Sequence, residues 1–174
     1  MKTLIVIAHP DIDSSIVNKY WIEELKKAPE EFTIHELYKV YPTEPFDIKH
    51  EQELIDSHDH LVLQFPVYWF SSPPLLKKWL DEVFLEGWAH GPNGGDKLKN
   101  KKIALAVSAG STADDYSIDG RYGHTLEQML IPFETTFLYC KADYRSIHAF
   151  YGEDPSNKEL EHNMKNYLTF LRNL

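Results

Sequence analysis

The sequence predicts an α/β fold, in which a five-stranded parallel sheet of strand order 2-1-3-4-5 carries helices on both faces. Short apolar runs of strand length recur along the chain, and segments with helical spacing of apolar residues separate them. This alternation is typical of parallel strands joined by right-handed helical crossovers. With 174 residues, 43% apolar and 26% charged, the chain is expected to form one domain over residues 1–174.

Three strands are predicted from short apolar runs, the second from a weak alternation over residues 32–37, and the fifth from a weaker pattern over residues 144–150. The first, Leu4 to Ala8, is continuously apolar, as expected of a strand buried on both faces. The others are expected at residues 32–37, 61–65, 103–107 and 144–150. Helices are predicted where apolar residues recur at spacings of three and four, over residues 16–25, 74–84, 126–137 and 160–171, with a shorter one near 51–57.

Prolines mark several boundaries of these elements. Pro29 closes the first helix, and Pro66 ends the third strand. Pro73 and Pro74 precede an apolar helical pattern, as expected in a first turn, where a missing N–H group costs little. Pro132 is expected to bend or shorten the helix over 126–137. Residues 87–102 are predicted to be an exposed loop, and residues 109–124 are polar and irregular.

Charge and motif content exclude several classes of protein. The formal net charge of −9 argues against a general affinity for nucleic acid or anionic membranes. The one cysteine, Cys140, excludes an internal disulfide framework and suits a reducing compartment. No secretory signal or membrane-spanning run is visible, so a cytoplasmic location is expected. The histidines lack metal-ligand spacing, and the sequence has no G-x-S-x-G, G-x-x-x-x-G-K or G-x-G-x-x-G motif.

A sheet of this order binds ligands outside the carboxyl ends of its strands, at the switch point between strands 1 and 3. Three loops meet there: the first loop (residues 9–18), the aromatic loop (residues 64–74) and the third loop (residues 108–124). In the first loop, helix-start N–H groups, the Ser14 and Ser15 hydroxyls and the Asn18 amide are suited to a phosphate. The alternative is that Ser14 or Ser15 only caps the helix.

The other two loops differ in character. The aromatic loop has Tyr68, Trp69 and Phe70 in succession, which favours either a flat aromatic ligand or a hydrophobic lid or dimer patch. The third loop begins with small residues, which allow backbone amides to approach a ligand closely. Tyr116 and His124 are its nearest titratable candidates, although a lone histidine is more often a surface or satisfied core residue.

At these residues the chain resembles the flavin-dependent NAD(P)H:quinone oxidoreductase family, in the short bacterial branch with general stress protein 14 and the Kef potassium-efflux ancillary proteins. The resemblance covers nearly the whole chain. It rests on Ala8-His9-Pro10 with Ser15 and Asn18, on the run from Gln64 to Phe70, and on the run from Pro73 to Trp79. Gly87-Trp88-Ala89 and Ser108-Ala109-Gly110-Ser111 extend it.

The resemblance implies a flavodoxin-like homodimer that holds FMN, or alternatively FAD. By similarity, His9 and the residues Ser15, Ile16, Val17 and Asn18 would lie on the flavin phosphate side. The flavin ring would meet Val67, Tyr68, Trp69 and Phe70, and its pyrimidine edge would meet Ser108, Ala109, Gly110 and Ser111. Tyr116 matches a family tyrosine near flavin and substrate, whereas the family histidine has no clean partner, with Tyr122, Gly123 and His124 all close in register. The short chain favours FMN.

The activity that the resemblance implies is two-electron hydride transfer from NAD(P)H, through the bound flavin, to a quinone or similar aromatic acceptor. One pocket used in turn by both substrates predicts a ping-pong mechanism. Three other interpretations remain open: a flavodoxin-type electron carrier, a regulatory subunit of a membrane potassium-efflux protein, and an azoreductase or nitroreductase acting at the same site.

Overall fold

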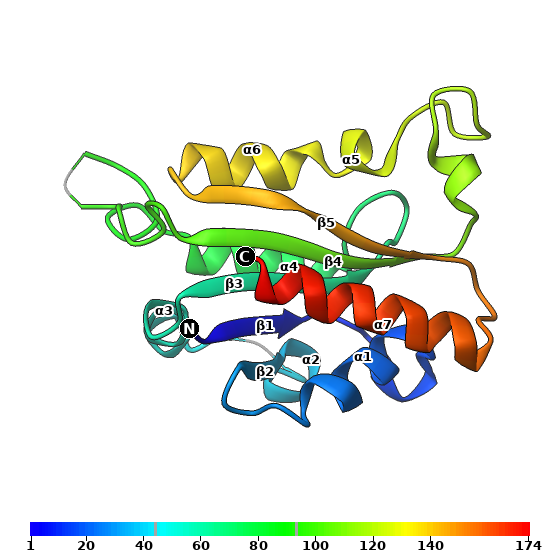
Figure 1. Cartoon of the computed structure of the whole chain (residues 1–174). Coiled ribbons are helices and arrows are strands. Elements are labelled where there is room, and N and C mark those ends of the chain that lie inside the picture. The colour runs from blue at the N-terminus through cyan, green and yellow to red at the C-terminus, as the bar shows by residue number, and fades with distance from the viewer. Residues whose placement is uncertain (44, 93) are drawn as a thin grey trace.

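The computed structural model describes residues 1–43, 45–92 and 94–174, and its centre is one parallel sheet (Figure 1). The strands are β1 (Thr3–Ile7), β2 (Phe32–Glu36), β3 (His60–Pro66), β4 (Lys102–Ala109) and β5 (Asp143–Tyr151). Their order is β2-β1-β3-β4-β5, with every neighbouring pair parallel. The predicted order 2-1-3-4-5 is therefore confirmed.

Helices cover both faces of this sheet (Figure 1). On one face, α1 (Val17–Leu25) and α7 (Asn157–Arg172) pack against the even-numbered apolar residues of β3 and β4, such as Val62 and Ala104. On the other face lie α2 (Leu37–Val40), α3 (Ile48–Asp56), α4 (Pro74–Val83), α5 (Leu126–Met129) and α6 (Ile131–Tyr139). The two cores use alternate residues of the same strands, because successive strand side chains point to opposite faces.

The structure corrects two of the sequence predictions. The helix expected over 126–137 is two helices, because Leu130 leaves helical geometry and Pro132 sits in the first turn of α6. The segment 87–102 is a loop, but it is not simply exposed: Trp88, Ala89 and Leu98 are buried in the core beside α4 and α6. Residue 93 of that segment, and residue 44 in the loop between Pro42 and Pro45, lie outside the described residues.

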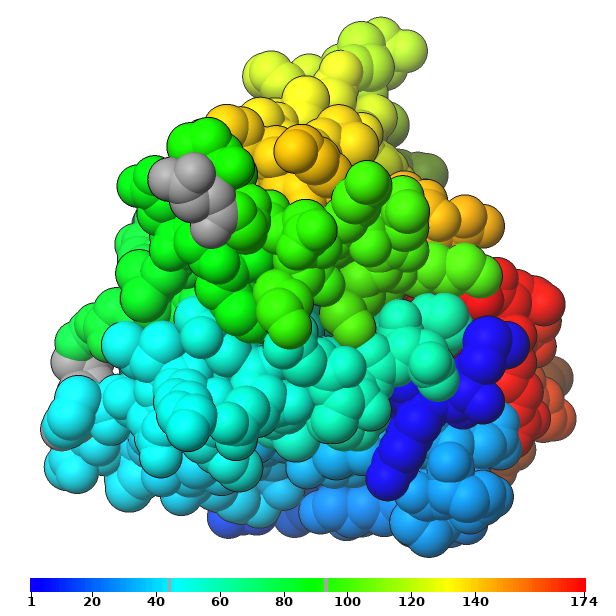
Figure 2. Space-filling model, turned by 90° about the vertical axis from the view of Figure 1, so that its left-hand side faces the viewer, coloured from blue at the N-terminus to red at the C-terminus, as the bar shows by residue number. Residues whose placement is uncertain are grey.

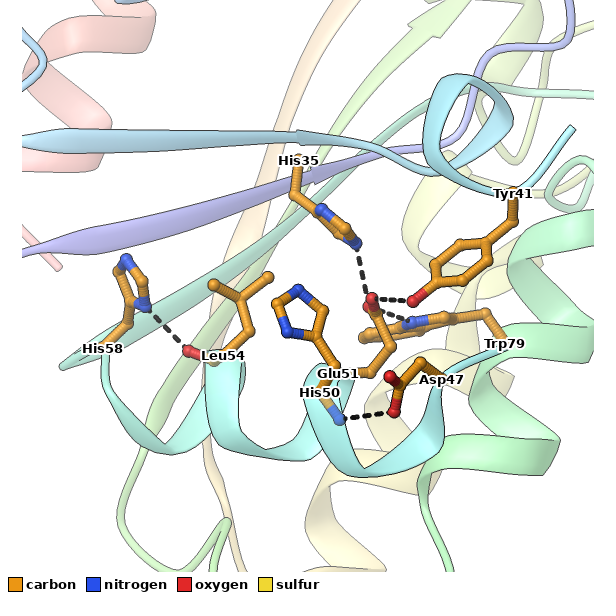
Figure 3. A network of polar contacts seen from close by, with 8 residues as sticks. All are labelled: His35, Tyr41, Asp47, His50, Glu51, Leu54, His58 and Trp79. Atoms are coloured by element: carbon orange, nitrogen blue, oxygen red, sulfur yellow. Dashed lines mark hydrogen bonds and ion pairs between the residues drawn. The ribbon is translucent and has the colours of Figure 1, made fainter. Parts of the chain in front are cut away.

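A buried carboxylate fastens three helices to the edge of the sheet (Figure 3). Glu51 of α3 is fully buried and accepts hydrogen bonds from the Tyr41 hydroxyl at 2.6 Å and Trp79 Nε1 of α4 at 2.8 Å. His35 Nε2 of β2 lies 2.9 Å from the same carboxylate. Burial alone would raise the pKa of the Glu51 carboxyl, but these hydrogen bonds together hold it below its ordinary value. Glu51 is therefore ionised at neutral pH.

The two ends of the sheet have different roles. Figure 2 views the amino ends of the strands, where the first residues, α3 and the segment before β4 close the surface. The loops that follow β1, β3 and β4 lie at the opposite end. Among the described residues, no helix is long and apolar enough to cross a bilayer. Within the same residues, no three His, Cys, Asp or Glu side chains gather in a way that could hold a metal ion.

Candidate functional site

Ser108, near the end of β4, joins the three loops at the carboxyl end of the sheet. Its carbonyl accepts a hydrogen bond from the Val67 N–H of the aromatic loop at 2.8 Å. Its hydroxyl oxygen accepts one from Asn18 Nδ2, which comes from the start of α1, also at 2.8 Å. The structure therefore brings the predicted first, aromatic and third loops together at the switch point between β1 and β3.

The first loop turns through η1 (Ile12–Ser14) before α1 begins. Ser15 Oγ accepts a hydrogen bond from the Asn18 N–H at 3.1 Å, so this serine caps the first turn of the helix. Capping was one of the two roles considered for it from the sequence. His9 Nδ1 accepts from the Asp11 N–H at 3.2 Å. Burial lowers the pKa of His9, and Asp11 opposes this only in part, so the ring is neutral near pH 7.

The aromatic loop contains a tight turn with a strained backbone. Tyr68 and Ser71 exchange two backbone hydrogen bonds, at 2.9 and 3.0 Å. The two residues between them, Trp69 and Phe70, have φ angles of +48° and +61°. This left-handed region suits glycine and costs other residues about 1–2 kcal/mol each. Strain of this kind clusters at ligand sites. Trp69 is also 94% exposed, so packing within this chain does not explain it.

Four aromatic rings pack against one another beside the aromatic and third loops. Tyr122 lies between Phe70 and Tyr116, with ring centroids 5.0 Å from each. Tyr151, at the end of β5, packs on Tyr116 at 5.6 Å. The Tyr122 hydroxyl lies 2.7 Å from Ser111 Oγ. Burial raises the pKa of Tyr116, which therefore keeps its proton and remains a hydrogen-bond donor at neutral pH.

Two of these aromatic side chains were not among the candidates proposed from the sequence, and one candidate lies apart. Tyr122 was named from the sequence only as one of three residues close in register to the family histidine. Tyr151 is the last residue of β5, at the same edge of the sheet. His124 is exposed, and its ring nitrogen lies 3.1 Å from the Tyr122 carbonyl of its own loop. On this loop it is Tyr122, and not His124, whose side chain bonds to Ser111.

Each of the three loops also offers unused main-chain donors. In the part of the chain that the structure describes, several N–H groups of these loops make no hydrogen bond, among them those of Ile16, Trp69, Phe70, Gly110 and Ser111. Backbone N–H groups are strong donors that normally find a partner. Together with the aromatic rings, they fit a flat ligand that carries several acceptor atoms and an anionic group near the start of α1. A flavin mononucleotide has all of these features.

Comparison with known proteins agrees with this site. A family model described as flavodoxin-like fold matches residues 1–171. The crystal structure of general stress protein 14 from Treponema denticola in complex with FMN is 49% identical, with a TM-score of 0.95 and coverage of 99% of this chain and 98% of that one. The NADPH-quinone reductase structure from P. pentosaceus is 26% identical, with a TM-score of 0.88 and coverage of 100% and 99%.

Two further relatives carry names that bear on function. The uncharacterised NAD(P)H oxidoreductase YrkL of Bacillus subtilis (strain 168) is 41% identical over 159 residues, which cover 91% of this chain and 90% of YrkL. The glutathione-regulated potassium-efflux system ancillary protein KefG of Erwinia tasmaniensis is 32% identical over 173 residues, which cover 99% and 93%. The chain therefore belongs to the flavodoxin-like family, in the branch of NAD(P)H oxidoreductases that includes general stress protein 14 and KefG.

Proposed function

We propose that this protein is a flavin-dependent NAD(P)H oxidoreductase that holds FMN between the loops following β1, β3 and β4. The observation that carries the proposal is the set of unpaired main-chain donors on these loops, beside the strained turn at Trp69 and Phe70. The FMN reported with the Treponema denticola relative supports the choice of cofactor. The names of YrkL and of the P. pentosaceus reductase support the choice of reaction.

Each of the three loops would bind a different part of FMN. Residues 15–18, with the neutral His9 beside them, would hold the phosphate through N–H groups at the start of α1. Residues 67–70 would hold the ring of the flavin, with Trp69 and Phe70 donating through their free N–H groups. Residues 108–111 would hold its polar edge, with Gly110 and Ser111 donating in the same way. The bound flavin would supply acceptance and donation of two electrons as hydride.

The protein's part in the reaction is orientation and charge stabilisation. The rings of Phe70, Tyr116 and Tyr122 offer flat apolar walls against which a nicotinamide or a quinone can lie. The free N–H groups of Gly110 and Ser111 and the Tyr116 hydroxyl would donate to negative charge that develops during transfer. One set of walls for two flat substrates means that they use the space in turn. The proposed acceptor is a quinone or a similar small aromatic compound.

The test is to identify the cofactor and then the order of binding. The purified protein is expected to be yellow, with one FMN per chain, and the stripped protein to take up FMN more tightly than FAD. NADPH or NADH oxidation with a quinone is expected to give parallel double-reciprocal lines. A colourless protein that neither flavin reconstitutes would refute the proposal, and intersecting lines would refute the shared site. NADPH oxidation also separates an enzyme from a flavodoxin-type carrier.

Relief of strain at Trp69 should separate stability from cofactor retention. Trp69→Gly is expected to raise the free energy of unfolding by up to about 1 kcal/mol, because the exposed ring loses no packing and glycine tolerates the positive φ. FMN retention should fall at the same time. Lys141→Gly is the matched control, since Lys141 has φ +60° and is exposed away from the site. Urea unfolding and FMN titration of both variants decide whether the strain serves the site.

The second part of the proposal is a homodimer with the site near its interface. Helix α6 is apolar on its outer side as well, with Ile131, Leu138 and Tyr139 each more than half exposed. A cleft of about 310 Å³ separates α6 from α4, and Ser71 and Ser72 of the aromatic loop line it as well. An exposed apolar face of this kind favours association. Light scattering at micromolar concentration gives the oligomeric state.

The KefG relative supports a second candidate function. In this function the protein would be a cytoplasmic ancillary subunit that binds a potassium-efflux protein of the membrane. The two functions are compatible, because the site described here leaves the surface of α3 and the amino end of the sheet unused (Figure 2). Retention of a detergent-solubilised potassium-efflux protein on an immobilised sample of this protein would favour the second function. If the potassium-efflux protein is not retained and NAD(P)H oxidation is intact, the result supports the enzyme function and not the ancillary one.

A further inference from the structure

Gln64 is a fully buried amide in the middle of an apolar sheet. Its strand, β3, is buried at every residue, and Gln64 is in register with Ile7 of β1 and Ala106 of β4. A buried amide without partners destabilises a protein by about 1–3 kcal/mol, so a glutamine here needs a reason. Its side chain shares the face of Val62, and therefore points toward α1 and α7.

A chain of hydrogen bonds runs from α7 through Gln64 to the candidate site. The Tyr167 hydroxyl donates to Gln64 Oε1 at 3.2 Å. Gln64 Nε2 donates to Asn18 Oδ1 at 3.3 Å, with the Asn18 carbonyl at 3.4 Å. Asn18 Nδ2 donates to Ser108 Oγ at 2.8 Å. Tyr167, Gln64 and Asn18 are each at most 1% exposed, so water does not compete for these bonds.

Tyr167, the first donor in this series of hydrogen bonds, is held in place by neighbouring rings. Tyr167 stacks on His148 with a centroid distance of 4.8 Å and an angle of 9° between the rings, and packs on Trp21 at 4.8 Å. Burial raises the pKa of Tyr167 far above its ordinary value, so the hydroxyl remains a donor. The side-chain amides of Gln64 and Asn18 then each accept a hydrogen bond through the oxygen and donate one through the nitrogen. This series of hydrogen bonds therefore has one direction, from α7 toward Ser108.

That direction defines the state of the Ser108 hydroxyl. The Ser108 oxygen accepts a hydrogen bond from Asn18 Nδ2, so the Ser108 hydroxyl can still donate its own hydrogen. No acceptor for that hydrogen lies among the described residues. The same direction explains why Asn18 is buried: its amide is engaged by Gln64 and Ser108 and does not face solvent. We propose that Tyr167, Gln64 and Asn18 are positioning residues that hold Ser108 as a hydrogen-bond donor to the bound flavin, an inference that rests on the proposed function.

A double-mutant cycle between the two ends of the chain tests this. Tyr167→Phe keeps the ring packing but removes the first donor, and Ser108→Ala removes the last. We expect each single variant to raise the FMN dissociation constant about tenfold, the effect of losing one hydrogen bond to a ligand. In the Ser108→Ala background, Tyr167→Phe should have no further effect, because the tyrosine acts only through Ser108. FMN fluorescence quenching on stripped protein gives all four constants.

A control on the same helix separates positioning from loss of packing. Asn163 of α7 accepts hydrogen bonds from Trp21 Nε1 at 3.1 Å and from His148 Nε2 at 3.0 Å, the two rings that hold Tyr167, but is not part of the chain. Asn163→Ala should lower the melting temperature of the stripped protein at least as much as Tyr167→Phe. Its FMN dissociation constant should stay within about twofold of the wild type.

The outcomes distinguish the inference from the function on which it rests. Wild-type protein that binds no FMN overturns the flavin site. Wild-type binding with additive effects in the cycle, or an equal loss of affinity in Asn163→Ala, overturns the positioning chain alone. If Tyr167→Phe does not fold, Gln64→Met replaces it, since that side chain has similar length and no hydrogen-bonding amide. The same cycle with Ser108→Ala then decides.

Discussion

Replacement of Glu51 with alanine is expected to lower the free energy of unfolding by about 3–5 kcal/mol, the usual effect of removing one member of a buried charged network. Glu51 is fully buried, and its carboxylate is the shared partner of His35, Tyr41 and Trp79 (Figure 3). Its loss leaves those three groups without their shared partner in an apolar surrounding and removes the side-chain hydrogen bonds that join α3 to β2 and to Trp79 of α4. Urea unfolding measured by circular dichroism gives the change.

Glu53→Ala is the matched control on the same helix. Glu53 is exposed and, among the described residues, its carboxylate pairs only with Lys49 at 3.7 Å, so its loss should change the free energy of unfolding by less than about 0.5 kcal/mol. The pKa of Glu51 lies below its ordinary 4.5, so the stability it contributes is present above that pH and is lost as pH falls through the lower folded value. Equal unfolding midpoints for Glu51→Ala and Glu53→Ala would contradict this account.

Tyr116→Phe is expected to lower the rate of NAD(P)H-dependent quinone reduction by about 10²-fold while FMN stays bound. The phenylalanine keeps the ring contacts with Tyr122 and Tyr151, so the fold should be unchanged. What it removes is a hydroxyl that remains protonated and has no hydrogen-bond partner among the described residues. A donor aimed at developing charge acts mainly in the transition state, where its loss costs about 10²–10³-fold. Stopped-flow absorbance of the flavin separates the two half-reactions.

His124→Gln serves as the comparison for this variant. The His124 side chain is exposed, and its ring lies within hydrogen-bond distance of the Tyr122 carbonyl, so the rate should change less than about threefold. Tyr122→Phe should have an intermediate effect, since its hydroxyl is already engaged by Ser111. A crippled His124→Gln variant beside a fully active Tyr116→Phe variant would mean that the third loop rearranges around the substrate and presents the histidine.

The sequence alone was sufficient to predict the sheet and to indicate a candidate site at its carboxyl end. Continuous apolar runs predicted β1, β3 and β4, because burial on both faces leaves a strong local pattern. The edge strands β2 and β5 are only partly buried and gave weaker patterns, but all five strands were predicted to within two residues. Strand order then followed from general rules of connection, and the switch point from that order. The sequence also indicated the three loops, since their residues follow three of the strands directly.

What the sequence did not reveal depends on contacts between residues far apart in the chain. Asn18 and Ser108 are 90 positions apart, and Gln64 and Tyr167 are 103 apart, so no local pattern connects them. Asn18 was expected to hold a phosphate with its amide, yet the fold gives that amide two protein partners.

Backbone conformation and loop register were also decided only by the tertiary structure. Nothing in the letters Trp69-Phe70 announces two left-handed residues, because that geometry is unfavourable locally and persists only where the surroundings enforce it. In the third loop, the short helix η2 (Ala113–Tyr116) and the turns after it determine that Tyr122 reaches Ser111 while His124 faces solvent. Apolar periodicity is a local property and determined the elements; polar partnership is a property of the folded chain, and only the packed structure assigns it.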